Sequence, residues 1–530
     1  AAKKAPPAIA QEITSALPSS SLVTAKAEGP YVNFTLVTER LVETTLKSVQ
    51  HWGERYGTVD PKGERVIVEH TSANPNGPFH VGRARNPIVG DTLGRILRNA
   101  GYEVTTEYYV NDMGKQVAIL NWGLKNLKPT DVTEAEREKV DHRLVPYYQK
   151  ANELLEKQPE VEAAINASLK RFEEGDREIA AQFREAASRV LEGMRESLSR
   201  LGVTMDNYAW ESDYVLRGDV GPVVEELKKA PTASQDDTGA WGIDLTEYGI
   251  SGKNPRWTFL RRDGTSLYTT RDLAYHQDKF KRADRAVNVL GEDHKLTMTQ
   301  LNIALDLLGI NRKPEVVWIS FVSLPEGKMS TRRNRVVFID DLLDEAVARA
   351  YEEVKKRRSE DLSEEQMARI AEAVGVGALR FNIVSVQPEK SIVFRWEDAL
   401  NFEGASAPYV MYSYARASSI LAKLTEERHL NPFHHPRWEK LTHESEVALV
   451  RAIARFPTAV EDAAAQLKPH AMAMYAIEVA NAFNQFYRDC PVARAEDAEL
   501  REARVALVRA AKTTLKNALA VLGIPALEEM

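Results

Sequence analysis

The sequence is poor in cysteine, in long apolar runs and in excess charge, and each shortage excludes a class of protein. Cys490 is the only cysteine among 530 residues, so an intramolecular disulfide and a multi-cysteine zinc site are both excluded. No apolar run approaches membrane-spanning length, and the N-terminus lacks the apolar core of a signal peptide. A cytoplasmic protein without a membrane partner is therefore predicted.

The charge balance argues against a generally basic nucleic-acid binder. The net charge is −7, which leaves room only for a local basic surface. The hydrophobic content of 43% and the charged content of 28% are ordinary for a globular protein. At this length we expect about three or four domains.

A strand, a turn, a helix and a second strand follow one another between residues 65 and 110. Arg65–Glu69 is a short β-branched run typical of a buried strand. Beyond a turn rich in glycine, proline and asparagine, a helix is predicted from Arg83 to a stop at Gly101, because apolar residues recur at helical spacing: Val89, Leu93, Ile96, Leu97 and Ala100. With a strand at 103–110, the stretch is predicted to be one βαβ unit with a right-handed crossover.

The turn Gly-Pro-Phe-His-Val-Gly-Arg at 77–83 leads into that helix. A helix N-terminus offers backbone N–H groups and a positive dipole end, which suit a phosphate. Gly77 and Gly82 have no Cβ, so a ligand can approach the backbone closely. His80 adds a donor, while Arg83 and Arg85 add permanent charge for a polyphosphate. A tight strand-to-helix connection with a surface histidine explains the spacing equally well.

Two later strands also end in polar loops. The apolar run 286–290 is followed by Gly-Glu-Asp-His at 291–294, and the run 316–322 leads to a loop containing Lys328. In open α/β sheets, ligands bind at the carboxyl ends of the strands. The sequence therefore predicts an α/β domain whose ligand crevice is built from segments far apart in the chain.

The flanking regions differ in character. Residues up to about 60 are predicted to form a small α+β module. Residues 127–201 are predicted to form a charged, helical, solvated insertion. Beyond about 395 the pattern is helical to the end, which predicts an all-α bundle. His434 and His435 are interpreted as surface residues.

The loop Lys-Met-Ser-Thr-Arg-Arg at 328–333, far along the chain from a His-Val-Gly turn, resembles the paired ATP motifs of class I aminoacyl-tRNA synthetases. More closely, the chain resembles arginyl-tRNA synthetases over nearly its whole length. The resemblance rests on the order and spacing of short motifs at 29–35, 68–86, 109–114, 262–274, 408–416 and 521–524.

This resemblance implies three domains. They are an N-terminal additional tRNA-contacting domain (1–60), a Rossmann-type catalytic domain (61–395) with a helical insertion at about 125–205, and a C-terminal helical anticodon-binding domain (396–530). It implies a ligase that activates arginine with ATP and transfers it to the 3′ end of tRNA-Arg. Two alternatives stay open: a class I synthetase for another amino acid, and a non-catalytic tRNA-binding paralogue.

The resemblance also implies the ATP site. The catalytic residues would be His80, Arg83 and Lys328. The remaining ATP contacts would be Gly77, Gly82, Glu292, Asp293, His294, Met329, Ser330 and Arg332. ATP would arrive with Mg²⁺ held by phosphate oxygens, with no zinc and no organic cofactor. Arg83 stands where the family usually has a second histidine, so this position acts as a fixed charge. A lysine usual after Lys-Met-Ser is also missing, and Arg332 or Arg333 is predicted to supply its charge.

The substrate contacts follow from the same matches. Carboxylates suit the planar guanidinium of arginine, and the implied pocket consists of Glu69, Asn74, Tyr268, Asp272 and Gln300. Plainer readings are a strand-end carboxylate for Glu69, a helix N-cap for Asp272 and a polar helix position for Gln300. Contacts with tRNA are implied for Asn33, Phe34, Tyr409, Tyr412, Arg416 and Met530, although one or more of the tyrosines near 409–414 should belong to the bundle core. We expect a monomer that needs bound tRNA before it activates arginine.

Overall fold

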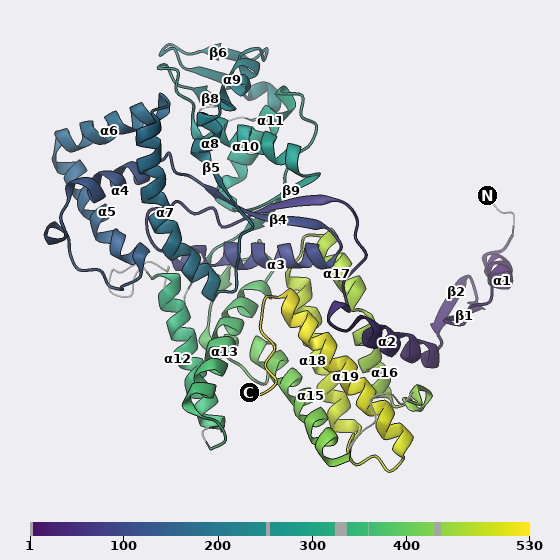
Figure 1. The fold of residues 1–530 in the computed structure, drawn as a ribbon. Helices are drawn as coiled ribbons and strands as arrows, with labels where there is room; N and C mark the ends of the chain where they lie inside the picture. Colours follow the sequence, from purple (N-terminus) through teal and green to yellow (C-terminus); the bar gives the residue numbers. More distant parts are fainter. Residues whose placement is uncertain (1–3, 251–254, 324–336, 359, 429–435) are drawn as a thin grey trace.

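The computed structural model describes residues 4–250, 255–323, 337–358, 360–428 and 436–530. Its centre is a five-stranded parallel sheet with the order β10-β9-β3-β4-β5 (Figure 1). The strands are β3 (Arg65–Glu69), β4 (Glu103–Val110), β5 (Asn207–Trp210), β9 (Arg285–Gly291) and β10 (Glu315–Ile319). The chain builds outward from β3 in one direction and then in the other, so β3 and β9 flank the topological switch point where such sheets bind ligands. The predicted Rossmann-type fold is confirmed.

The predicted βαβ unit is present. β3 and β4 are parallel neighbours, joined by α3 (Arg85–Asn99). The predicted apolar stripe of α3 is fully buried because this helix lies between the sheet and the C-terminal helices (Figure 1). Gly101 follows the end of α3 with φ +86, and a Cβ there would meet the Asp60 carbonyl oxygen at 2.2 Å, so this position requires glycine.

A smaller lobe is formed mainly by the chain between β5 and β9, with one helix, α11 (Lys295–Leu307), added after β9. An antiparallel sheet of β6 (Ala233–Gln235), β7 (Trp241–Asp244) and β8 (Arg256–Leu260) packs with α8 (Glu211–Leu216), α9 (Val220–Lys228), α10 (Tyr268–Arg282) and α11 around a separate core. The strand predicted at 316–322 is interrupted, because Ser320 N–H donates to the Pro388 carbonyl at 2.9 Å. The chain then resumes as β11 (Val322–Ser323), which pairs with β12 (Ile392–Val393).

The 127–201 region was predicted to be a solvated insertion, but its helices pack closely against one another and against α4 (Lys115–Asn126). It forms α5 (Val140–Lys157), α6 (Pro159–Glu173) and α7 (Arg177–Arg200). Its buried polar side chains reach the first turn of α12 (Ile339–Arg358). There the Asp340 carboxylate accepts from Lys139 at 2.8 Å, Ser197 at 2.8 Å and His142 at 2.9 Å. Burial opposes ionisation, but the bonds from His142 and Lys139 hold the pKa of Asp340 well below its usual range.

The C-terminal half is helical, as predicted, although the helices begin before residue 396. After α12 come α13 (Glu364–Val384), α14 (Trp396–Ala399), α15 (Ala407–Arg428), α16 (Glu444–Ala454), α17 (Phe456–Ala465), α18 (His470–Asp489) and α19 (Ala498–Val521). The described residues contain no helix that combines the length and apolarity needed to cross a membrane.

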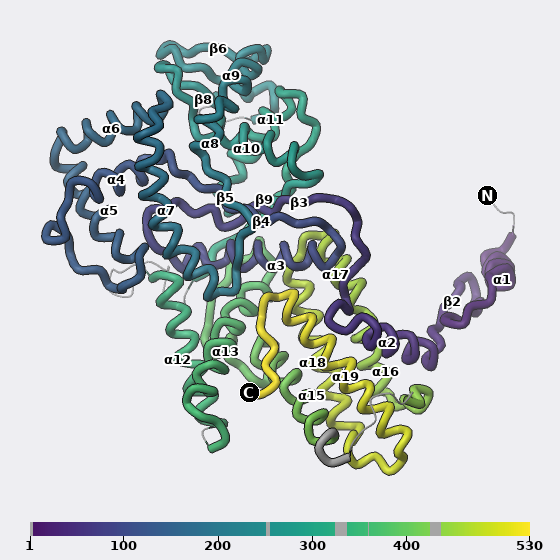
Figure 2. The backbone as a smooth tube through the Cα atoms, viewed as in Figure 1, coloured from purple at the N-terminus to yellow at the C-terminus, as the bar shows by residue number. Residues whose placement is uncertain are grey.

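The N-terminal segment extends away from the rest (Figure 2). It comprises α1 (Pro6–Ala16), the hairpin of β1 (Val23–Glu28) and β2 (Tyr31–Leu36), and α2 (Thr38–Trp52). Only α2 packs closely on the C-terminal bundle, against α16 and α19. Just beyond α2, the Tyr56 hydroxyl donates to the Ile453 carbonyl at 2.9 Å.

Candidate active site

A cavity of about 340 Å³ lies at the carboxyl ends of β3 and β9. Its walls come from the turn after β3, the ends of β4 and β9, and helices α8, α10 and α11. It is therefore at the switch point that the strand order predicts. Seven of the residues predicted from the sequence line it: Glu69, Gly82, Arg83, Tyr268, Asp272, Asp293 and His294.

Four carboxylates line this cavity, and the three other than the exposed Asp293 each have a close basic partner. Glu69 pairs with Lys279, Asp272 with His276 Nδ1 at 3.1 Å, and Glu211 with Arg271 at 2.7 Å. Burial opposes ionisation of Asp272, but His276 and Lys279 hold its pKa below the usual range. Asp272 lies inside α10, whose N-cap is Leu267, so the reading of Asp272 as an N-cap is wrong.

Three buried polar atoms in the cavity wall have no hydrogen-bond partner among the described residues. They are Glu211 Oε2, the Tyr109 hydroxyl oxygen and Asn111 Oδ1. Burial raises the pKa of Glu211 to about 7, despite Arg271, and raises the pKa of Tyr109 well above its usual range. Because buried polar atoms are normally satisfied, these three mark the place of a ligand that donates hydrogen bonds.

None of these three residues was assigned a site role from the sequence. Tyr109 and Asn111 belong to the 109–114 motif at the end of a predicted strand, and that position was the available signal. Glu211 follows β5, a strand of four residues that carried no clear sequence pattern. Its place at the crevice depends on β5 pairing with β4.

The 77–83 turn ends with the 3₁₀ turn η2 (Val81–Arg83), capped by His80. His80 Nδ1 accepts from Gly82 N–H at 2.9 Å, so the ring proton lies on Nε2. The Gly82 N–H is thus bonded to His80 in this structure, while Gly82 lines the cavity, and its contact with phosphate stays a prediction. Arg83 is exposed and lines the cavity, as a fixed charge for a phosphate requires.

Arg85 does not face the cavity, so its predicted contact with a polyphosphate is wrong. Its guanidinium is fully buried and donates to three backbone carbonyls, those of Lys390 at 2.5 Å, Gln387 at 2.7 Å and Ser320 at 3.0 Å. Arg85 thus fixes the start of α3 against the segments that follow β10 and precede β12.

The predicted residues of the second ATP motif, Lys328, Met329, Ser330, Arg332 and Arg333, lie outside the described residues, as do His434 and His435. The segments on either side of 324–336 are described and lie beside the first motif. Val81 N–H donates to Val337 O at 3.0 Å, and Ile339 N–H donates to Phe79 O at 2.8 Å. On the other side, Arg85 holds the Ser320 carbonyl.

Several predicted residues lie outside the cavity lining. Asn74 donates to Gln116 Oε1 at 3.0 Å, and Glu292 pairs with Lys295 at 2.7 Å. From α11 the cavity is lined by Thr297 and Met298, with Gln300 farther along the helix. The remaining predicted residues outside this lining are Gly77 and His80.

The residues predicted to contact tRNA occupy two separate surfaces. On the bundle, Tyr412 is 41% exposed and carries the Arg416 guanidinium 4.7 Å from its ring centroid, while the Tyr409 hydroxyl donates to Asn481 at 2.8 Å. Tyr414 is buried, which confirms that at least one tyrosine here belongs to the core.

On the N-terminal hairpin, Phe34 is 63% exposed and Asn33 donates to Glu28 at 2.9 Å. Met530, predicted to contact tRNA, is instead buried, and its carbonyl accepts from Arg358.

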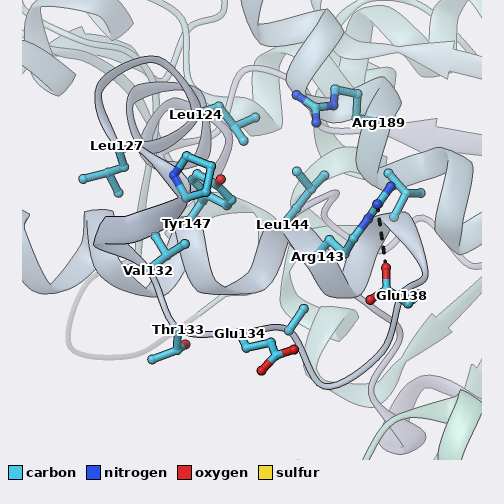
Figure 3. A pocket seen from close by; sticks show the side chains of 13 residues that line it. Leu124, Leu127, Val132, Thr133, Glu134, Glu138, Arg143, Leu144, Tyr147 and Arg189 are labelled. Atoms are coloured by element: carbon cyan, nitrogen blue, oxygen red, sulfur yellow. Dashed lines mark ion pairs between the residues drawn. The ribbon is translucent and has the colours of Figure 1, made fainter.

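A second cavity, of about 650 Å³, lies in the insertion (Figure 3). Leu124, Leu127, Leu144 and Tyr147 supply much of its apolar wall, with an Arg143–Glu138 ion pair at one side. It contains none of the carboxylates described above, so its larger volume does not make it the candidate active site.

Comparison with known proteins gives a consistent result over the whole chain. The family model "tRNA synthetases class I (R), catalytic domain" matches residues 45–396, and the "DALR anticodon binding domain" matches residues 410–530. The chain is 47% identical to the arginine–tRNA ligase of Methanocella arvoryzae, covering 100% of this chain and 91% of that protein. It is 44% identical to the arginine–tRNA ligase of Methanosarcina acetivorans, with the same coverage. Among solved structures, Thermus thermophilus arginyl-tRNA synthetase superposes with a TM-score of 0.83 at 29% identity, covering 100% of this chain and 92% of that one.

Proposed function

The chain belongs to the arginyl-tRNA synthetase family, and from that premise we propose how its crevice performs the reaction. The enzyme is an arginine–tRNA ligase, which activates arginine with ATP and charges tRNA. One observation supports the assignment of its substrate pocket. Four carboxylates line its cavity, and in the wall Glu211 Oε2, the Tyr109 hydroxyl oxygen and Asn111 Oδ1 are buried without partners among the described residues.

The guanidinium of arginine matches this arrangement. It carries five N–H donors in a planar fork and no acceptor, and it stays protonated. Glu211 Oε2 and Asp272 would take the charged fork, with Glu69 completing the acidic wall. The Tyr109 oxygen and Asn111 Oδ1 would accept remaining hydrogen bonds. A ligand with fewer donors, such as a lysine ammonium, would leave buried acceptors unsatisfied and so be disfavoured.

ATP would bind between the 77–83 turn and the 324–336 segment. In the first step an arginine carboxylate oxygen attacks the α-phosphorus, an O–P bond forms, and the bond to the β-phosphate oxygen breaks to release pyrophosphate. This chemistry depends mainly on positioning and charge. His80 Nε2 would donate to a phosphate oxygen, while Arg83 and Lys328 would stabilise the departing pyrophosphate. Mg²⁺ would enter as part of the ATP complex.

In the second step a terminal ribose hydroxyl of the tRNA attacks the activated carbonyl, an ester forms and AMP leaves. The exposed Tyr412–Arg416 pair offers a stacking surface to an unstacked anticodon base. The monomeric state expected from the sequence stays a prediction.

ATP–pyrophosphate exchange tests the proposed function. We expect exchange with arginine alone among the twenty amino acids, and only when tRNA is present. Exchange driven by another amino acid would favour a synthetase of different specificity. No exchange with any amino acid, with or without tRNA, would favour a non-catalytic tRNA-binding protein. Robust exchange with arginine in the absence of tRNA would refute the tRNA requirement alone.

The pKa of Glu211 predicts a pH dependence of arginine binding. Below about pH 7 the Glu211 carboxyl is protonated and cannot accept from a guanidinium, whereas above it the carboxylate is present. The KM for arginine should therefore fall as the pH rises, by about tenfold between pH 6 and pH 8. Exchange measured at saturating ATP and tRNA checks this. The Glu211→Gln variant should lose the inflection, and an inflection that persists in that variant would assign it to another group.

A further inference from the structure

Lys279, on α10, is fully buried and does not line the cavity, but its ammonium contacts Glu69, which does line it. Its Nζ donates to Glu69 Oε2 and, at 2.8 Å, to Asn288 Oδ1. It also lies 4.2 Å from the centroid of the Tyr275 ring. An ammonium has three donors, so two hydrogen bonds and one aromatic face satisfy it completely and hold it in one place.

This ammonium joins the two strands that form the crevice. Glu69, the last residue of β3, and Asn288, in the middle of β9, are register partners. Beyond Asn288 a hydrogen-bond chain continues to Asp272. Asn288 Nδ2 donates to His276 Nε2 at 2.9 Å, and His276 Nδ1–H donates to the Asp272 backbone carbonyl at 2.9 Å, with Asp272 Oδ1 3.1 Å away. One buried cation thus supports Glu69 directly and Asp272 through two side chains.

We infer that Lys279 is a positioning residue for the arginine site, acting through Glu69; this rests on the function proposed above. Three carboxylates lining one partly buried cavity repel one another, and a buried carboxylate without a counterion is strongly disfavoured. Lys279 supplies a fixed countercharge behind Glu69. It engages Oε2 while Oε1 accepts from Ser72 at 3.1 Å, which holds the carboxylate in one orientation before arginine arrives.

The test begins with Lys279→Met, assayed by tRNA-dependent exchange. The KM for arginine should rise about 10- to 100-fold, because Glu69 loses its buried counterion. The KM for ATP should stay within about twofold of the wild-type value. Lys279→Gln, which keeps donors to Glu69 and Asn288 without the charge, provides a second variant if Lys279→Met folds poorly. It should show the same rise.

A double-mutant cycle separates positioning from general stabilisation. In a Glu69→Gln background, adding Lys279→Met should change the KM for arginine by no more than about threefold, because the partner charge is already gone. Arg282→Met is the matched control. Arg282 lies one turn further along α10 and pairs with the buried Glu107 outside the cavity. It should lower the melting temperature without changing the KM for arginine.

Two outcomes would overturn the inference: an unchanged KM for arginine in both Lys279 variants, or an equal proportional rise with and without the Glu69 carboxylate. If Glu69→Gln alone leaves that KM unchanged, the assignment of Glu69 to the arginine pocket fails. That result is distinct from a failure of Lys279.

Discussion

Glu211→Gln should lower kcat/KM for arginine by about 10²- to 10³-fold, which corresponds to about 3–4 kcal/mol. The substitution is nearly isosteric, but it replaces a charge-assisted acceptor with a neutral amide whose NH₂ group opposes a guanidinium that has only donors. Truncating one partner of a buried, hydrogen-bonded charge pair typically costs about 2–5 kcal/mol. Exchange kinetics with varied arginine, at saturating ATP and tRNA, provide the measurement.

Glu107→Gln is the matched control for this prediction. Glu107 is also a fully buried glutamate paired with an arginine, Arg282 at 2.8 Å, but it does not line the cavity. It should reduce stability and leave kcat/KM for arginine within about threefold of the wild-type value. Equal losses of kcat/KM in the two variants would mean that Glu211 acts only through stability, and the guanidinium assignment would be withdrawn.

Arg380→Met should destabilise the protein by about 3–5 kcal/mol, as expected when one partner of a buried ion pair is removed. The Arg380 guanidinium is fully buried and lies 2.5 Å from Asp91 of α3. It also donates to Leu201 O at 2.7 Å and to Leu522 O at 3.0 Å. It therefore joins α3, the end of the insertion and the end of α19, and its loss leaves two carbonyls unsatisfied.

The midpoint of urea unfolding, followed by circular dichroism and by tryptophan fluorescence, measures this effect. Arg95→Met provides the comparison, since Arg95 pairs with the same Asp91 at 2.8 Å but its side chain is 33% exposed. The loss for Arg95→Met should be about 1 kcal/mol, because solvent screens a partly exposed pair. Equal shifts in the two variants would show that Arg380 contributes no more than a surface ion pair.

Local patterns were sufficient for the βαβ unit, because buried β-branched runs and helical apolar spacing depend on neighbouring residues. They predicted β3, α3 and β4, and they placed the crevice at the carboxyl ends of parallel strands. Glu69, at the end of β3, and Asp272, inside α10, were assigned from motifs of the family resemblance, and both line the cavity. The resemblance to arginyl-tRNA synthetases, carried by the order of short motifs, supplied the substrate class, which the family comparisons support.

Local sequence patterns did not show which groups the charged side chains would contact in the folded chain. Arg85 belongs to a motif suited to phosphate, yet in the folded chain it donates to carbonyls more than 230 residues away. Its orientation follows from where the segments after β10 and before β12 pack, which no nearby residue specifies.

The contacts among the charged residues of the cavity also could not be predicted from local patterns. Lys279 and Glu69 are 210 residues apart, and Glu211 reaches the crevice only because β5 pairs with β4. Such contacts depend on the order of strands in the sheet, whereas the sequence pattern reports only which segments become strands. Interactions between residues close together in the sequence therefore determined the helices and strands and the motifs they carry. The packing of distant segments decided which carboxylates share one cavity and which cation supports them.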